Sequence, residues 1–285
     1  MKQNLLSLLI VISLLVPVMS KAQEVSPEPT ANTEETLPNT EGLIFERPTV
    51  ADQIKDVKQT YRGQFESYRN SERQFQVAKG QFQQLNTLIS LETAVKATRQ
   101  VMLDRVTVMS TYLRLLKLQL IETTGVSLPL KEQTLAEIDV LLIDLQAHLE
   151  QIEKAQDRDS VNARADEFTA AMPEIEETAY QALTLITVGP FQTVYDKSRS
   201  LVDVLEVEAA TASTAVKQPE KDRAFIQTSQ TLDTVQFNLG EVLADINNPD
   251  RRFTRSNYSQ ITRDLQPIQS GLNQSIGFLL ELLRI

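Results

Sequence analysis

Four arginines near the carboxyl end of the sequence are the side chains best suited to binding an anionic partner. Arg251, Arg252, Arg255 and Arg263 surround Tyr258 in a chain whose formal net charge is −10. Guanidinium groups bind carboxylates and phosphates through paired hydrogen bonds. We therefore treat these five residues as a candidate interaction patch for an acidic protein or for an envelope polymer that carries phosphates or carboxylates.

The same arginines also have a purely structural explanation. Arg251 and Arg252 come shortly after Asn247-Asn248-Pro249, where a helix is expected to end. Cations are favoured at a helix C-terminus because the free backbone carbonyls there carry partial negative charge. Arginines in such loops also form exposed ion pairs that contribute little to stability. We prefer this explanation and keep the interaction patch as the binding hypothesis.

Histidine and cysteine offer little catalytic or metal-binding chemistry. His148 is the only histidine and there is no cysteine, which excludes a metal site built on two histidines or on thiolates. The sequence Asp157-Arg158-Asp159 starts like a calcium-binding loop. However, Asn162 stands at the position of the required glycine and Phe168 at that of the closing glutamate. We predict no catalytic residue, no metal ligand and no cofactor.

The acidic side chains leave one enzymatic alternative open. Glu174, Glu176 and Glu177 follow Pro173 in the expected first turn of a helix, where the helix dipole favours carboxylates. Glycoside hydrolysis needs two carboxylates across a cleft, and a helical sequence alone does not reveal such a pair. Our preferred function is a non-enzymatic structural or interaction protein. The alternative is a ligand-binding or hydrolytic helical domain that acts on envelope material through acidic residues.

An aromatic or aliphatic residue recurs every seven positions in the first part of the chain. The members of this aromatic ladder are Ile54, Tyr61, Tyr68, Phe75, Phe82 and Ile89. Exposed rings in a groove can bind sugars or bases, but the residues between the rings are polar and the ladder continues into isoleucines. We interpret it as one buried stripe on a long, otherwise polar helix.

Helical periodicity continues to the end of the chain, and no alternating strand pattern occurs. We predict an all-α fold, an elongated antiparallel bundle of five to six long helices with coiled-coil-like seams. The seams expected to face inward are Leu135, Ile138, Leu142, Leu145, Leu149 and Ile152 in a third helix, Phe225, Leu232, Val235, Leu239, Val242 and Ile246 in a fifth, and Ile261, Leu265, Ile268, Leu272, Ile276, Leu279 and Leu283 in the last.

The first two helices meet where the apolar pattern changes phase. A second stripe begins at Leu88 and lies one position out of register with the aromatic ladder. Helices over 48–88 and 91–124 are therefore either separate or joined through a local change of register. Gly125 is placed to cap the second of them.

The following helical stretch contains two sites that should interrupt it. Pro173 and Gly189-Pro190 lie within the region from about residue 161 to residue 212, and each proline removes a backbone N–H from the helical ladder. We expect a kink or a restart at these positions. We assign residues 48–212 to a helical bundle and residues 213–285 to a C-terminal helical hairpin that packs on it or continues it.

Residues 1–22 have the pattern of a secretory signal peptide. Lys2 precedes an apolar run, and Ser20 and Ala22 supply the small residues of a cleavage site. We expect cleavage near Ala22 and a secreted or extracytoplasmic protein, at the cell surface or in the periplasm; retention as an N-terminal anchor is the alternative. Residues 23–47 are acidic, contain three prolines, and should form a disordered linker.

The charge balance limits the classes of partner. Cleavage would remove Lys2 and Lys21 and no acidic residue, so the net charge would change from −10 to −12. Such a chain lacks the basic surface that nucleic-acid binding requires, and an anionic lipid surface would repel it. We predict a protein or envelope-polymer partner, no nucleic acid, and no membrane span in the mature chain. The oligomeric state does not follow from the sequence.

One block of sequence resembles a known group of proteins. The segment ATRQVMLDRVTVMSTYLRLLKLQLIETTGVSL, residues 97–128, is similar to a recurring segment in secreted, all-helical proteins of uncultured small-genome bacteria, through Ala97-Thr98-Arg99, Arg105, Tyr112-Leu113 and Glu122-Thr123-Thr124-Gly125. The resemblance extends weakly over residues 48–200. Those proteins have no assigned activity, so the resemblance implies an extracytoplasmic helical bundle and no mechanism.

Overall fold

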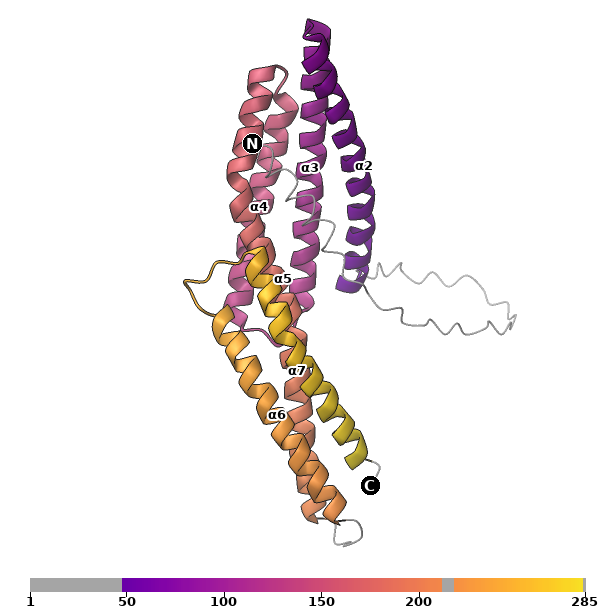
Figure 1. The fold of residues 1–285 in the computed structure, drawn as a ribbon, viewed down its shortest axis with the longest axis vertical. Helices are drawn as coiled ribbons and strands as arrows, with labels where there is room; N and C mark the ends of the chain where they lie inside the picture. The colour runs from indigo at the N-terminus through magenta and orange to yellow at the C-terminus, as the bar shows by residue number, and fades with distance from the viewer. Residues whose placement is uncertain (1–47, 212–217, 284–285) are drawn as a thin grey trace, which may run out of the picture. The chain divides into compact units, whose positions relative to one another are not determined.

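The fold consists of six long helices and, in the residues described, no strand. The structure is a computed structural model that describes residues 48–211 and 218–283 (Figure 1). The helices are α2 (Val50–Leu85), α3 (Leu88–Glu122), α4 (Leu128–Lys154), α5 (Arg158–Thr211), α6 (Gln218–Ile246) and α7 (Arg255–Leu282). The predicted all-α antiparallel helical bundle is confirmed. The predicted signal peptide and linker, residues 1–22 and 23–47, lie outside the described residues.

Two groups of helices share the long helix α5. Helix α3 packs against α2, α4 and α5, whereas α6 and α7 pack against each other and against α5. The first part of α5 lies along α4, where Arg164 pairs with Gln151, and its last part lies along α6, where Arg199 reaches Asp233. In Figure 1, α5 can be followed from one group of helices into the other.

The α2–α3 connection is a true helix break, so one of the two sequence alternatives is wrong. Asn86 takes the left-handed conformation, with φ 45°, and ends α2. Thr87 begins α3 with a capping box: its hydroxyl accepts from the Ser90 amide at 3.2 Å, and the Ser90 hydroxyl accepts from the Thr87 amide at 3.1 Å. A local change of register within one continuous helix is therefore excluded.

The aromatic ladder forms the inner face of α2, except at its end. Tyr68 is buried against Val101 and Val108 of α3, with Tyr61 and Phe75 packed beside it. Ile89, however, is 77 % exposed, and Leu88, at the start of the second stripe, is also exposed. Both were predicted inside. Ile89 is exposed because the chain reverses direction at Asn86, so residues beyond it do not continue the inner face of α2, and Leu88 is the first residue of α3, at the tip of the hairpin.

Helix α5 is continuous through both of its prolines, so the predicted restart at Pro173 or at Gly189-Pro190 is wrong, whereas a kink there stays a prediction. Each proline removes one backbone hydrogen bond and crowds the preceding turn, and the packing of α5 against α3, α4, α6 and α7 offsets that cost. Gly189 has another role. A Cβ atom there would lie 2.3 Å from the carbonyl oxygen of Thr124, so the glycine allows the α3–α4 loop to touch the backbone of α5.

Gly125 is the other half of this contact rather than a helix cap. Helix α3 ends at Glu122 with Thr123 as its C-cap, and Gly125 follows in the loop with φ 78°. A Cβ atom on Gly125 would lie 2.2 Å from the carbonyl oxygen of Gly189. Two glycines thus meet backbone to backbone, and the Thr193 hydroxyl donates to the Gly189 carbonyl at 3.0 Å beside them.

The predicted seams of the later helices are mostly buried. In α4, Ile138, Leu145 and Ile152 are buried and the other three predicted residues are half-buried. The predicted residues of α6 are buried apart from Phe225, which is half-buried. In α7 the predictions at Ile276 and Leu283 are wrong, because both are exposed and their neighbours Ser275 and Leu282 are buried. The strict alternation of three and four residues continues through α7 and places the serine inside.

Candidate functional site

The five residues of the predicted interaction patch do not share one environment. Arg251 pairs with Asp245 at the end of α6 and its side chain is almost fully buried. Arg252 is exposed in the α6–α7 loop, and the Arg263 guanidinium donates to Gln260 on its own helix at 2.5 Å. One of the arginines is thus held by an ion pair at the end of α6, as the structural explanation expects. Binding of an anionic partner by the exposed ones stays a prediction.

Tyr258 faces the inside of the molecule. Its ring lies 6.0 Å from the ring of Tyr180 on α5, and its hydroxyl lies 3.4 Å from the hydroxyl of Thr187. Arg255 is close enough for its charge to act on Tyr180, although burial has the larger effect and raises the pKa of that phenol. Tyr258 and Arg255 therefore belong partly to the α5–α7 contact.

His148 packs in the bundle between an aromatic ring and a carboxylate. Its ring stacks on Phe168 with ring centroids 5.7 Å apart, and Nδ1 lies 3.9 Å from a carboxylate oxygen of Glu167. Burial lowers the pKa of His148, against the weaker opposite effect of Glu167. Within the described residues, no three His, Cys, Asp or Glu side chains gather closely enough to hold a metal ion.

A polar cluster inside the first helical group was not recognised in the sequence. The Arg105 guanidinium on α3 lies 5.0 Å from the ring centroid of Phe168, and its charge acts on Tyr68, Glu72 and Glu176. Burial raises the pKa of the Glu176 carboxyl, and the positive charge of Arg105 opposes that rise. Arginine is thus stacked and partly buried where the seam of an ordinary bundle would carry leucine.

Four tyrosines extend this cluster toward α7. The rings of Tyr61 and Tyr112 lie 5.8 Å apart, and Tyr180 and Tyr258 lie near enough that their deprotonated forms would further raise the pKa of the buried Tyr112 phenol. Burial raises the pKa of Tyr61 to about 12 and that of Tyr112 well above its usual value. These phenols therefore stay protonated near neutral pH and act as core side chains, because a general acid or base needs a pKa near the working pH.

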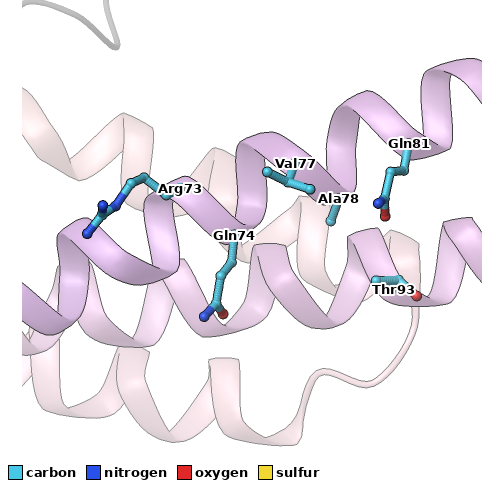
Figure 2. Close-up of a pocket in the computed structure, with 6 residues that line it drawn as sticks. All are labelled: Arg73, Gln74, Val77, Ala78, Gln81 and Thr93. Atoms are coloured by element: carbon cyan, nitrogen blue, oxygen red, sulfur yellow. The ribbon is translucent and has the colours of Figure 1, made fainter.

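A surface groove lies between α2 and α3 near the tip of their hairpin, and we call it the hairpin groove. Its volume is about 340 Å³, and it is lined by Arg73, Gln74, Val77, Ala78, Gln81 and Thr93. Figure 2 shows the five α2 residues on successive turns and Thr93 on the neighbouring helix. The groove is open along its length.

The floor and the rim of the hairpin groove differ in character. Ala78 is 5 % exposed and lies deep, whereas Val77 is 60 % exposed and stands at the rim. Ile89, also exposed, lies one helical turn before Thr93 on α3. The lining therefore combines an exposed aliphatic side chain at Val77 with a buried apolar floor at Ala78.

The charge around the hairpin groove is positive, in contrast to the chain as a whole. Between residues 73 and 96 the sequence contains Arg73, Lys79 and Lys96 against the single acid Glu92. Arg73 donates to the Arg69 carbonyl on its own helix at 3.3 Å. In the described part of the chain, none of the three cations forms an ion pair with an acidic side chain. The groove therefore offers positive charge to a partner.

A second groove lies between α6 and α7 and is chemically plainer. Its volume is about 410 Å³, and amide and hydroxyl side chains line most of it, with Val235, Pro267 and Gly271 among them. It carries no charged side chain in its lining. The hairpin groove is the better candidate because it combines an apolar floor with charge.

Comparisons with known proteins supply no relative: no family model, no curated protein and no solved structure matches the chain. No helix among residues 48–211 and 218–283 combines the length and the apolar character that crossing a bilayer requires. The assignment of a function therefore depends on the surfaces of this chain alone.

Proposed function

We propose that this protein is a non-enzymatic, extracytoplasmic interaction protein that binds an amphipathic helix in the hairpin groove. The observation that carries the proposal is the combination in one open groove of an apolar floor at Ala78, an exposed aliphatic rim at Val77, and the cation Arg73. The extracytoplasmic location is supported by the signal-peptide pattern of residues 1–22 and by the resemblance to secreted helical proteins.

The size and the openness of the groove favour a side chain over a small molecule. Pockets that enclose small ligands have volumes of roughly 300–1,000 Å³ and cover most of the ligand surface. At about 340 Å³ the hairpin groove is at the small end of that range and is open along one side. A Leu, Ile or Val side chain from a partner helix would fill its floor, as in other complexes in which a helix lies in a groove.

The positive charge around the groove predicts which residues flank the apolar seam of the partner helix. Arg73 at the rim and Lys96 one turn beyond Thr93 favour Asp or Glu beside the apolar residues of the partner. The hydrolytic alternative would need two carboxylates facing each other. The lining of the hairpin groove contains no carboxylate, so this groove supports binding rather than hydrolysis.

Two designed helical peptides test the proposal. Both carry the same Leu/Ile seam, one with glutamates and the other with lysines beside it, and each is titrated with the protein while its fluorescence anisotropy is measured. We expect the acidic peptide to bind and Arg73→Glu to weaken binding by roughly fivefold, the effect of about 1 kcal/mol from one exposed ion pair.

Arg62→Glu is the matched control, because Arg62 is an exposed arginine on α2 three helical turns from Arg73. This variant should bind the acidic peptide as the unchanged protein does. Equal binding of both peptides, or binding that Arg73→Glu leaves unchanged, would show that the hairpin groove is not the docking site.

A further inference from the structure

Helix α4 carries a second apolar seam that the described chain leaves uncovered. Ala136, Val140, Ile143 and Ala147 follow one another at spacings of four, three and four residues, and we call them the α4 stripe. Val140 is 55 % and Ile143 is 69 % exposed, and both alanines are exposed. The spacing is that of a coiled-coil seam.

The α4 stripe faces away from the bundle. The buried residues of α4 include Ile138, Leu145 and Ile152, which pack toward α3 and α5. At 100° per residue, the α4 stripe falls on the opposite side of the helix from this buried seam. Helix α4 therefore has two apolar faces, of which the described part of its own chain covers one.

Carboxylates border the α4 stripe on both sides. They are Glu132, Glu137, Asp139, Asp144 and Glu150. Lys117 pairs with Asp139 at 2.5 Å, and no other of these acids forms an ion pair with a described residue. Lys131, the nearest cation on the helix itself, donates instead to the carbonyl oxygens of Ile121 and Thr123 at 2.8 and 2.7 Å.

We propose that the α4 stripe of one copy of this protein fills the hairpin groove of a second copy. This inference rests on the proposed function and names the partner of the same groove. Val140 and Ile143 supply the branched side chains that the floor at Ala78 accepts, and Ala136 and Ala147 allow the helices to approach closely. Glu137 and Asp144 then supply the negative charge that Arg73 and Lys96 lack in their own chain.

The contact has to be between copies. The α4 stripe faces away from the helices that pack on the other side of α4, so it does not reach the α2–α3 hairpin of its own chain. Because the two surfaces differ, each copy can offer its stripe to one neighbour and its groove to another. A stripe of two branched residues buries little area, so the association should be weak and reversible.

Charge exchange tests the inference. The groove variant carries Arg73→Glu and Lys96→Glu, and the stripe variant carries Glu137→Lys and Asp144→Lys. Sedimentation velocity is measured over a range of concentrations for each protein alone and for an equimolar mixture. We expect the unchanged protein to associate as concentration rises and each variant alone to remain monomeric.

The mixture is the decisive sample. In the mixture, the acidic groove of the groove variant can meet the basic stripe of the stripe variant. The original groove of the stripe variant can likewise meet the original stripe of the groove variant. Opposite charges therefore face each other at both contacts. We expect association to return in the mixture. A control pair, Arg62→Glu and Glu66→Lys on α2 outside the hairpin groove, should leave association unchanged. Circular dichroism spectra and melting temperatures establish that every variant is folded.

The outcomes separate this inference from the proposed function. An unchanged protein that stays monomeric at every concentration, while the acidic peptide still binds at Arg73, would overturn self-association and leave the groove as a site for another helix. Association that persists in both variants alone would overturn the inference, because the contact would then use other surfaces. Loss of both association and peptide binding would overturn both proposals.

Discussion

The two antiparallel hairpins of the fold, α2–α3 and α6–α7, solve the same packing problem with different side chains. The α6–α7 seam is aliphatic: Leu232, Val235, Leu239, Val242 and Ile246 meet Ile261, Leu265, Ile268, Leu272 and Leu279. The α2–α3 seam instead combines rings and a guanidinium with the aliphatic residues Val101 and Val108. Tyr61, Tyr68 and Phe75 of α2 face a surface of α3 that includes Arg105 and Tyr112.

The difference shows in the polar atoms left without partners. In the α2–α3 hairpin, buried atoms of Gln64, Arg99, Arg105 and Tyr112 have no hydrogen-bond partner within the described residues, whereas in the described residues of α6 and α7 the Ser275 hydroxyl alone lacks one. In α6–α7, the helices come close enough that Gly271 lies directly against Val235. Aliphatic side chains interdigitate at crystal-like density. Both hairpins nevertheless carry a surface groove, of about 340 Å³ in α2–α3 and about 410 Å³ in α6–α7, so the two seams differ in chemistry rather than in the presence of a groove.

Alkaline pH should cause the largest loss of stability, and this loss should come from the α2–α3 hairpin rather than from α6–α7. Burial raises the pKa of Tyr61 from 10.0 to about 12 and also raises those of Tyr68 and Tyr112. Their contribution to stability is fully present below pH 10 and is lost as pH rises toward 12, because the unfolded chain releases its phenolic protons first. Urea unfolding midpoints at pH 9 to 12 should fall steeply, and Tyr61→Phe should flatten the curve. An unchanged slope in that variant would mean that the ring of Tyr61 is solvated.

Truncation within the aliphatic seam should have the next largest effect. Leu239 is almost completely buried, and Leu239→Ala should lower the free energy of unfolding by about 3–4 kcal/mol through lost burial and a cavity. Phe237→Ala on the exposed face of the same helix is the control and should change stability by less than about 0.5 kcal/mol. The free energies of unfolding are measured by urea denaturation. Equal decreases in the two variants would show that Leu239 is not buried between α6 and α7.

Adding one carbon to the close contact of α6 with α7 should destabilise the fold more modestly. A Cβ atom on Gly271 would lie 2.6 Å from Cγ2 of Val235. We expect Gly271→Ala to cost about 1–2 kcal/mol, since overpacking outweighs the gain in helix propensity. Gly240→Ala, which meets nothing within 4 Å, should instead stabilise the protein by up to about 1 kcal/mol. A stabilising Gly271→Ala would show that α6 and α7 lie further apart.

Truncating a ring in the α2–α3 seam should cost less than truncating the leucine in α6. Phe75 is half-buried, and the Lys79 amine lies 5.6 Å from its ring centroid. We expect Phe75→Ala to lower the free energy of unfolding by about 1–2 kcal/mol. A loss as large as that of Leu239→Ala would mean that the aromatic seam is packed as tightly as the aliphatic one.

The substitution with the smallest expected effect, Tyr112→Phe, should stabilise the protein instead of destabilising it. The buried Tyr112 hydroxyl has no partner within the described residues, so Tyr112→Phe removes the cost of burying it. We expect unfolding to become harder by up to about 1 kcal/mol. Thermal denaturation checks this, and a clear decrease in melting temperature would reveal a hydrogen bond that the hydroxyl makes in solution.

The aliphatic half of the fold was predictable because its seams follow a simple rule. In α6 and in most of α7, spacings of three and four residues identify the buried side chains by hydrophobicity alone. The rule failed at Ser275, which is buried where the pattern of hydrophobic residues favoured Ile276. Helix geometry decides which positions face inward, and one small polar residue is not enough to change it.

The candidate site was not predictable from the same rule. Val77 and Ala78 fall between members of the aromatic ladder, so neither stood out, and the groove exists only because Thr93 returns beside them after the reversal at Asn86. The α4 stripe was overlooked for a different reason. The seam through Ile138 and Leu145 already makes α4 an amphipathic helix, and Val140 and Ile143 form a second seam at the same spacing.

The contact of Gly125 with Gly189 determines the register of α5, that is, which of its residues lies against the α3–α4 loop. A coiled-coil seam repeats every seven residues, so a long helix can slide by one repeat and still match its neighbours. Sliding α5 by seven residues would bring Ala182 or Asp196 to the α3–α4 loop, and either would place a Cβ atom where the loop backbone now lies. Only glycine fits there. The Gly125–Gly189 contact therefore fixes the register of α5 against its neighbouring helices, where the apolar seams alone would allow several registers.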